Sequence, residues 1–119
     1  MWLDDNTLMG NIPTEIGLAT DLASLSLSNS TLTGKIPSEL GGIVGLRRVW
    51  LYNNQLTGGI PSQIGNLASL EVFEVQDNLL VGQMPQPVCA TVGASDYEHK
   101  SLMADCSEVA CSNCCTACL

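Results

Sequence analysis

Apolar residues recur along most of the chain at a fixed step of about 24 residues, a period within the range of repeat architectures. In residues 46–69 the apolar positions are Leu46, Val49, Leu51, Leu56, Ile60, Ile64 and Leu67. The same step separates the glycines Gly10, Gly34, Gly58 and Gly82 and the prolines Pro13, Pro37, Pro61 and Pro85. Four phased copies of one unit predict that the chain folds as a series of equivalent, stacked coils.

Alternation within each unit predicts one strand per coil. Residues 49–52 read Val-Trp-Leu-Tyr, so aliphatic residues alternate with residues of another kind, as in a strand with one buried and one exposed face. The equivalent strands centre on Leu25/Leu27 and Phe73/Val75. Stacked one per coil, these strands form a parallel sheet on the inner, concave side. Each glycine can then take a positive φ where the chain reverses, and each proline suits a return segment outside the sheet.

The unit L-x-x-L-x-L-x-x-N-x-L, followed by G-x-I-P, resembles the plant-type leucine-rich repeat of receptor-kinase ectodomains and polygalacturonase-inhibiting proteins. The resemblance covers residues 1–89. It implies an α/β-type repeat solenoid with a parallel β-sheet on the concave face and 3-10 or irregular segments on the convex face. Residues 1–89 are then a solenoid of about 3.5 repeats, and residues 90–119 form a C-terminal cap.

The first coil is expected to be incomplete, because Leu3, Asn6 and Leu8 match only the second half of the repeat's strand. A solenoid end without a capping element would leave several apolar side chains in water. Those side chains are Leu3, Leu8, Ile12 and Ile16. We therefore expect self-association through this coil.

An asparagine recurs in the repeat where the strand ends. Asn6, Asn54 and Asn78 share this position, and Ser30 takes it in the second coil. A carboxamide both donates and accepts, so it can bond buried backbone groups that would otherwise cost about 1–3 kcal/mol each. We expect a structural ladder of asparagines, with a looser turn at Ser30, whose single hydroxyl supplies fewer bonds.

The C-terminal region departs from the repeat. Residues 90–101 carry no periodicity and predict a loop, and Leu102 and Ala104 predict one last short strand. The cysteines are Cys89, Cys106, Cys111, Cys114, Cys115 and Cys118. Two adjoining C-x-x-C pairs allow zinc, but nothing separates them, so they can hardly surround one ion. An even count favours three disulfides among 15 possible pairings, and the tail resembles the ends of some secreted microalgal leucine-rich-repeat proteins.

Composition excludes several classes of partner. The net charge is −8 with only four Lys and Arg, so nucleic acid and anionic membranes are not expected partners. The sequence has no apolar run of about 18 residues, the length that a membrane span needs. It also has no nucleophile elbow, phosphate loop or pair of histidine ligands, and its single histidine, His99, lies in the predicted loop. We expect no catalytic residue, metal or cofactor.

The outward positions of the predicted strands form the candidate binding face. These residues are Arg48, Trp50 and Tyr52, with Trp2, Asp4, Ser26, Ser28, Glu74 and Gln76 around them. Trp2 would lie about 10 Å from Trp50, across small serines, if neighbouring strands are about 4.8 Å apart. Trp, Tyr and Arg are enriched at binding hot spots, so a shallow recognition slot is predicted.

Together these features predict a non-catalytic extracellular or cell-surface module that recognises a protein, peptide or cell-wall glycan. The alternative is a structural or adhesive wall protein in which the aromatic slot has no ligand. Asn29-Ser30-Thr31 is an N-glycosylation sequon. A glycan at Asn29 would cover part of the concave face.

Overall fold

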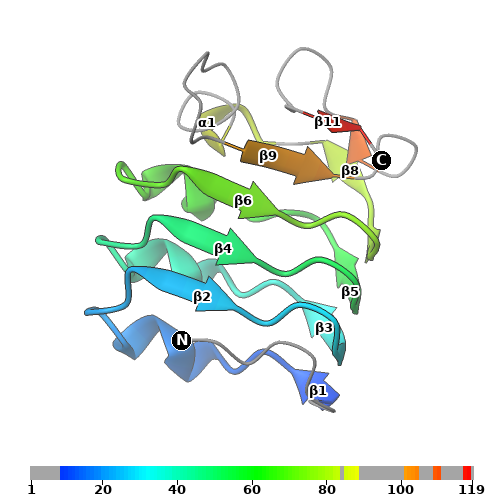
Figure 1. Cartoon of the computed structure of the whole chain (residues 1–119), viewed down its shortest axis with the longest axis horizontal. Coiled ribbons are helices and arrows are strands. Elements are labelled where there is room, and N and C mark those ends of the chain that lie inside the picture. The colour runs from blue at the N-terminus through cyan, green and yellow to red at the C-terminus, as the bar shows by residue number, and fades with distance from the viewer. Residues whose placement is uncertain (1–8, 84, 89–100, 105–108, 111–116, 119) are drawn as a thin grey trace.

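The chain folds into stacked coils whose strands lie side by side in parallel sheets (Figure 1). The computed structural model describes residues 9–83, 85–88, 101–104, 109–110 and 117–118. The coils follow one another in chain order, from β1 at one end to α1 and β11 at the other (Figure 1). The repeats whose concave strands begin at Ser24, Arg48 and Val72 each pass from that strand, through a second strand, to a short helix on the convex side.

The concave strands form one five-stranded sheet in the order β11-β9-β6-β4-β2. The strands are β2 (Ser24–Ser26), β4 (Arg48–Trp50), β6 (Val72–Glu74), β9 (Ser101–Ala104) and β11 (Ala117–Cys118). Leu25 pairs with Val49, and Val49 with Phe73, so each partner lies one sequence repeat along the chain. Equivalent inward side chains therefore stack in columns. The predicted concave sheet and the predicted strand around Leu102 are confirmed.

A second parallel sheet, absent from the sequence-based prediction, lies beside the concave one. Its order is β1-β3-β5-β7, with β1 (Met9–Asn11), β3 (Thr31–Lys35), β5 (Gln55–Gly58) and β7 (Leu79–Leu80). Leu32, Leu56 and Leu80 point into the core, while their neighbours along each strand are exposed. The repeat glycines take the expected positive φ, 79° at Gly34, but Gly34 lies inside β3 and not at a free reversal.

Short helices line the convex side, as predicted. They are η1 (Thr14–Leu18), η2 (Ser38–Gly42), η3 (Ser62–Asn66) and α1 (Gln86–Val88). Each 3-10 helix follows a repeat proline, which is its N-cap and keeps an extended backbone, with φ near −70° and ψ of 142°, 135° and 136° at Pro13, Pro37 and Pro61. The helices stack on one another in chain order, η1 on η2, η2 on η3 and η3 on α1.

The core is one continuous column of repeat leucines, isoleucines and valines, with Phe73 as its largest side chain. Ile12 belongs to this core and is 4% exposed, so the expectation that the first coil leaves it in water is wrong. Ile16 is partly buried against the same cluster, because coil two packs over the inward side of coil one. Leu3 and Leu8 lie outside the described residues.

The C-terminal segment extends the concave sheet and adds a separate two-stranded sheet. β9 pairs with β6, and β10 (Val109–Ala110) pairs with β8 (Gly82–Gln83). Val72 pairs with Ser101, so this partner lies further along the chain than one repeat of about 24 residues. The division into solenoid and cap stays a prediction.

A column of glycines lets the convex helices approach closely. A Cβ at Gly17 would lie 2.7 Å from the carbonyl oxygen of Glu39, and one at Gly41 would meet the carbonyl of Gln63 still more closely. A Cβ at Gly65 would collide with the ring and the backbone carbons of Pro87. Backbone atoms cannot swing aside as a side chain does, so a methyl group here would push two coils apart.

Gly41→Ala is therefore expected to lower the free energy of unfolding by about 1–3 kcal/mol, the usual cost of overpacking. Gly42 is the matched control, since a Cβ there meets nothing within 4 Å. Gly42→Ala should be neutral or stabilising by about 0.4–1 kcal/mol. Urea unfolding followed by circular dichroism measures both variants, and equal midpoints for the two would contradict the close stacking.

Candidate ligand-binding face

The side chains of Arg48, Trp50 and Tyr52 share one face of the concave sheet. Between them, Val49 and Leu51 are 0% exposed and point into the core. Arg48 is exposed, whereas Trp50 and Tyr52 are partly buried. Tyr52 lies just beyond β4, but its carbonyl still accepts a hydrogen bond from the Asn29 amide of the neighbouring coil, at 3.1 Å. The backbone that carries these three side chains is therefore paired with the neighbouring coil from Arg48 to Tyr52.

The neighbouring strands set the charges around this line. In the sheet Arg48 lies between Ser24 and Val72, which are uncharged. Trp50 lies between Ser26 and Glu74. We name Arg48, Trp50, Tyr52 and Glu74 the concave site. It combines an exposed cation, two aromatic rings and a partly buried carboxylate one strand away.

Three of the predicted contact residues are not accessible. Ser26 is 1% exposed, Ser28 0% and Gln76 7%, so the expectation that they meet a ligand is corrected. Ser26 lies beside Trp50 in the sheet. The small hydroxymethyl group of Ser26 is covered by the larger side chain of its neighbour, on a strand about 4.8 Å away. Strand alternation gives the face of a residue but not its exposure. These three side chains lie beneath the accessible surface of the concave face.

Trp2 and Asp4 lie outside the described residues. The slot expected between Trp2 and Trp50 therefore stays a prediction. Asn6, His99 and the side chains of the six cysteines also lie outside the described part of the chain, so the disulfides stay a prediction too.

Asn54 and Asn78 bond buried backbone groups of their own and the preceding coil. The Oδ1 of Asn54 accepts from the Leu32 amide at 3.1 Å, and its Nδ2 donates to the carbonyls of Leu27 at 2.9 Å and Leu51 at 3.1 Å. Asn78 repeats this pattern one coil later, with the Leu56 amide at 3.0 Å. At the same position Ser30 donates one bond of 3.4 Å, to the carbonyl of Ser28.

A second row of polar residues precedes this ladder by one position. Asn29, Asn53 and Asp77 have φ of 55°, 58° and 57°. They form left-handed turns, a conformation in which Asn and Asp are enriched. The Nδ2 of Asn53 donates to the Oδ1 of Asn29 at 2.7 Å. The common spacing of one repeat, together with the residue types, is a signal that could have identified these turns.

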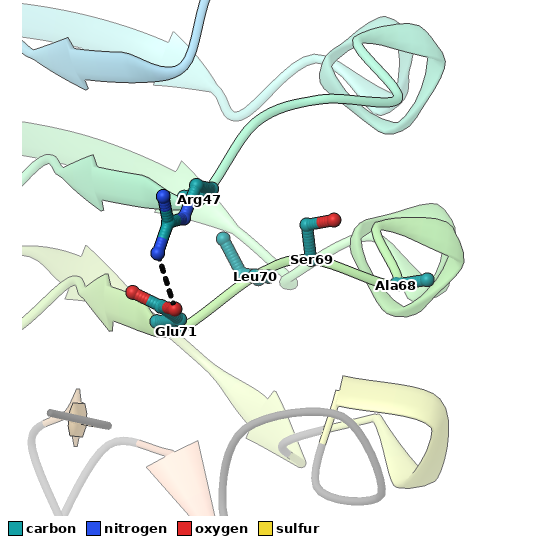
Figure 2. Close-up of a pocket in the computed structure, with 5 residues that line it drawn as sticks. All are labelled: Arg47, Ala68, Ser69, Leu70 and Glu71. Atoms are coloured by element: carbon teal, nitrogen blue, oxygen red, sulfur yellow. Dashed lines mark hydrogen bonds and ion pairs between the residues drawn. The ribbon is translucent and has the colours of Figure 1, made fainter. Parts of the chain in front are cut away.

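An ion pair missed by the sequence reading joins the loops that enter β4 and β6. Figure 2 shows Arg47 reaching Glu71, with the Nη2–Oε1 distance at 2.8 Å. A hollow of about 460 Å³ lies here, lined by Arg47, Ala68, Ser69, Leu70 and Glu71. The pair is partly exposed, so its contribution to stability is about 0–1 kcal/mol. The hollow lies beside the entry to the strands and does not include the aromatic residues of the concave site.

The fold and the repeats together define a leucine-rich-repeat solenoid. The family model for the Leucine Rich Repeat matches residues 21–43 and 45–67, which are the second and third coils. Among the described residues no helix has the length and hydropathy to cross a membrane. No curated protein matches the chain in sequence.

Solved plant structures share this fold. The plant peptide hormone receptor RGFR1, solved in complex with RGF2, is 31% identical over 82% of this chain and 15% of its own, with a TM-score of 0.71. A chain of the BIR3–SERK2 complex from Arabidopsis thaliana is 33% identical over 77% of this chain and 50% of its own, with a TM-score of 0.73. A plant ice-binding protein is 28% identical over 92% of this chain and 33% of its own, with a TM-score of 0.74. The chain is thus similar to plant receptor structures and to a plant ice-binding protein. It spans at most half the length of each of these three chains.

Proposed function

We propose that the chain is a non-catalytic, extracellular recognition module that binds an extended peptide or protein segment through the concave site. The observation that carries this proposal is the alignment of Arg48, Trp50 and Tyr52 on one face, above a fully buried row. Similarity to a receptor solved with a peptide hormone, and to a complex of two proteins, supports it.

The chemistry of the site favours a particular kind of segment. The Arg48 side chain makes no ion pair with any described residue, so its guanidinium is available to a carboxylate in a bidentate pair. Trp50 and Tyr52 offer rigid aromatic surface at low entropic cost. Arg48 and Trp50 are two residues apart on one strand, or about 6–7 Å. A ligand with an acidic group one such step from an aromatic or aliphatic side chain matches this spacing.

A displayed library of random peptides tests the proposal, with an array of cell-wall oligosaccharides as a second probe. Peptides enriched on the wild-type chain should contain acidic and aromatic residues and should bind saturably in titration calorimetry. Arg48→Ala should weaken them, whereas Arg47→Ala should not, because Arg47 faces the entry loop. Equal binding to both variants, or no saturable binding to either probe, would overturn the proposal.

The second sheet favours a second candidate, the structural or adhesive alternative. Thr31, Thr33, Gln55 and Thr57 are exposed on its outer face, and Lys35 is the only charged residue in its four strands. Neutral hydroxyls on a parallel sheet suit a flat, repetitive surface, and a similar solved structure is a plant ice-binding protein. Thermal hysteresis lost in Thr33→Lys but kept in Trp50→Ala would favour this role. No hysteresis in the wild-type chain would exclude ice as the surface.

Self-association through the first coil also remains a proposal. Although Ile12 is buried, Met9 and Leu18 are both 80% exposed at this end. Sedimentation velocity over a concentration series tests it, and we expect a shift toward larger species as concentration rises. A constant monomer up to the highest concentration would contradict it.

A further inference from the structure

Asn29, the first residue of the sequon, lies at the junction of the two sheets. It follows β2 and comes two residues before Thr31, which opens β3. Its backbone takes the left-handed conformation, with φ of 55°, and its side chain is partly exposed. Asn29 thus lies in a surface turn between β2 and β3.

The two polar atoms of the Asn29 carboxamide have different surroundings. Oδ1 accepts the 2.7 Å hydrogen bond from Asn53 Nδ2, which fixes the plane of the amide. The backbone amide of Asn29 is bonded to the Tyr52 carbonyl at 3.1 Å. Nδ2, the atom that carries a sugar in N-glycoproteins, donates no hydrogen bond to any described residue. The side chain is held by its oxygen and its nitrogen is left available.

The asparagines at the next turn lack this combination. Asn53 uses its Nδ2 for the bond to Asn29, and Asn54 uses its Nδ2 for three carbonyls while 8% exposed. Gln55 and Leu56 stand two residues after them, where a sequon needs Ser or Thr. Among the asparagines in the described part of the chain, Asn29 alone joins the motif to an available, accessible nitrogen.

We propose that Asn29 carries an N-linked glycan. The donor is an oligosaccharide linked through pyrophosphate to a membrane lipid. Nδ2 attacks the first sugar carbon, the N–C bond forms, and the C–O bond to phosphate breaks with its electron pair leaving on the lipid pyrophosphate. The Nδ2 proton passes to a base of the transferase. The carbonyl Oδ1 is unchanged by this reaction, so the bond from Asn53 survives and the glycan does not disrupt the turn.

The position of the glycan restricts the concave site. Asn29 is bonded to Tyr52 at the end of the concave strands, whereas Arg48 pairs with Ser24 at their beginning. A sugar on Asn29 therefore stands beside Tyr52 and Asn53 and leaves Arg48 and Trp50 open. Ligands are then admitted from the Arg48 end of the face.

The test is secretion of the full chain from a eukaryotic host, followed by mass measurement before and after peptide-N-glycosidase treatment. The wild-type chain should lose a glycan mass and gain aspartate at position 29. Thr31→Ser keeps the sequon and should stay modified, while Thr31→Ala and Asn29→Asp should both be secreted without the glycan. Aspartate also tolerates positive φ and can accept from Asn53, so this variant separates loss of the sugar from loss of the turn.

Secreted wild-type chain with an unmodified Asn29 would overturn the inference, and so would a glycan that persists in Asn29→Asp. Neither result depends on whether the concave site has a ligand. If the peptide selection fails, this test still decides whether Asn29 carries a glycan.

Discussion

Asn54→Ala is expected to lower the free energy of unfolding by about 2–6 kcal/mol. The change leaves two buried backbone groups without hydrogen-bond partners, at a cost of about 1–3 kcal/mol each. Alanine would leave the Leu32 amide without its acceptor and the Leu27 carbonyl without its Asn54 donor, in a buried region between two coils. The Leu51 carbonyl keeps its 2.9 Å bond from Asn78, so it adds little. Small domains are stable by about 5–15 kcal/mol, and this change alone would bring the chain near unfolding.

Urea unfolding with circular dichroism measures the loss. Asn66→Ala is the control, because Asn66 is exposed at the end of η3 and its substitution should change stability by about 0.5 kcal/mol or less. The converse change, Ser30→Asn, should add about 1 kcal/mol by supplying the carboxamide that the second coil lacks. A loss below about 1 kcal/mol in Asn54→Ala would mean that water replaces the side chain without cost.

Trp50→Ala is expected to weaken the best peptide selected on the wild-type chain by about thirtyfold, or about 2 kcal/mol. Trp50 stands at the middle of the concave site, where truncation removes the largest rigid contact. Its side chain is only partly buried and lies on the opposite side of the strand from Val49 and Leu51. The loss of folding stability should therefore stay below the roughly 3–5 kcal/mol of a buried Trp.

Titration calorimetry measures the affinity, and thermal melting separates binding from folding. Leu51→Ala is the matched comparison, since Leu51 is 0% exposed and should cost about 2–5 kcal/mol of stability. A melting temperature as low in Trp50→Ala as in Leu51→Ala would show that the ring is a packing residue. Unchanged affinity with unchanged melting would move the ligand site away from this strand.

The concave face shows which structural features the sequence can predict and which it cannot. Alternation around Val49 correctly predicts which residues of β2, β4 and β6 point inward, because a strand has a fixed period of two. It does not predict how deeply an outward residue is covered. That depends on the size of its neighbour in the next coil, as for Ser26 beside Trp50.

The second sheet shows a different limit. Its strands are short, and a positive-φ glycine lies inside β3, so local signals favour a turn. In the concave sheet Leu25 pairs with Val49, which is the equivalent residue of the next repeat. In the second sheet Met9 pairs with Thr31 and Thr33 with Gln55, and each partner comes slightly before the equivalent position of the next repeat. The register there is displaced from the sequence repeat, and a periodic sequence alone cannot specify such a displacement.

The sequence by itself determined the coil, the concave sheet and the convex turns of this protein. Identical phased residues make identical local conformations, and stacking them aligns equivalent positions. Only the tertiary structure decided the second sheet, the burial of Ser26 beside Trp50, and the Arg47–Glu71 pair. Each of these depends on contacts between coils, because burial, register and hydrogen-bond partners are set by residues about one repeat away and not by their neighbours in the chain.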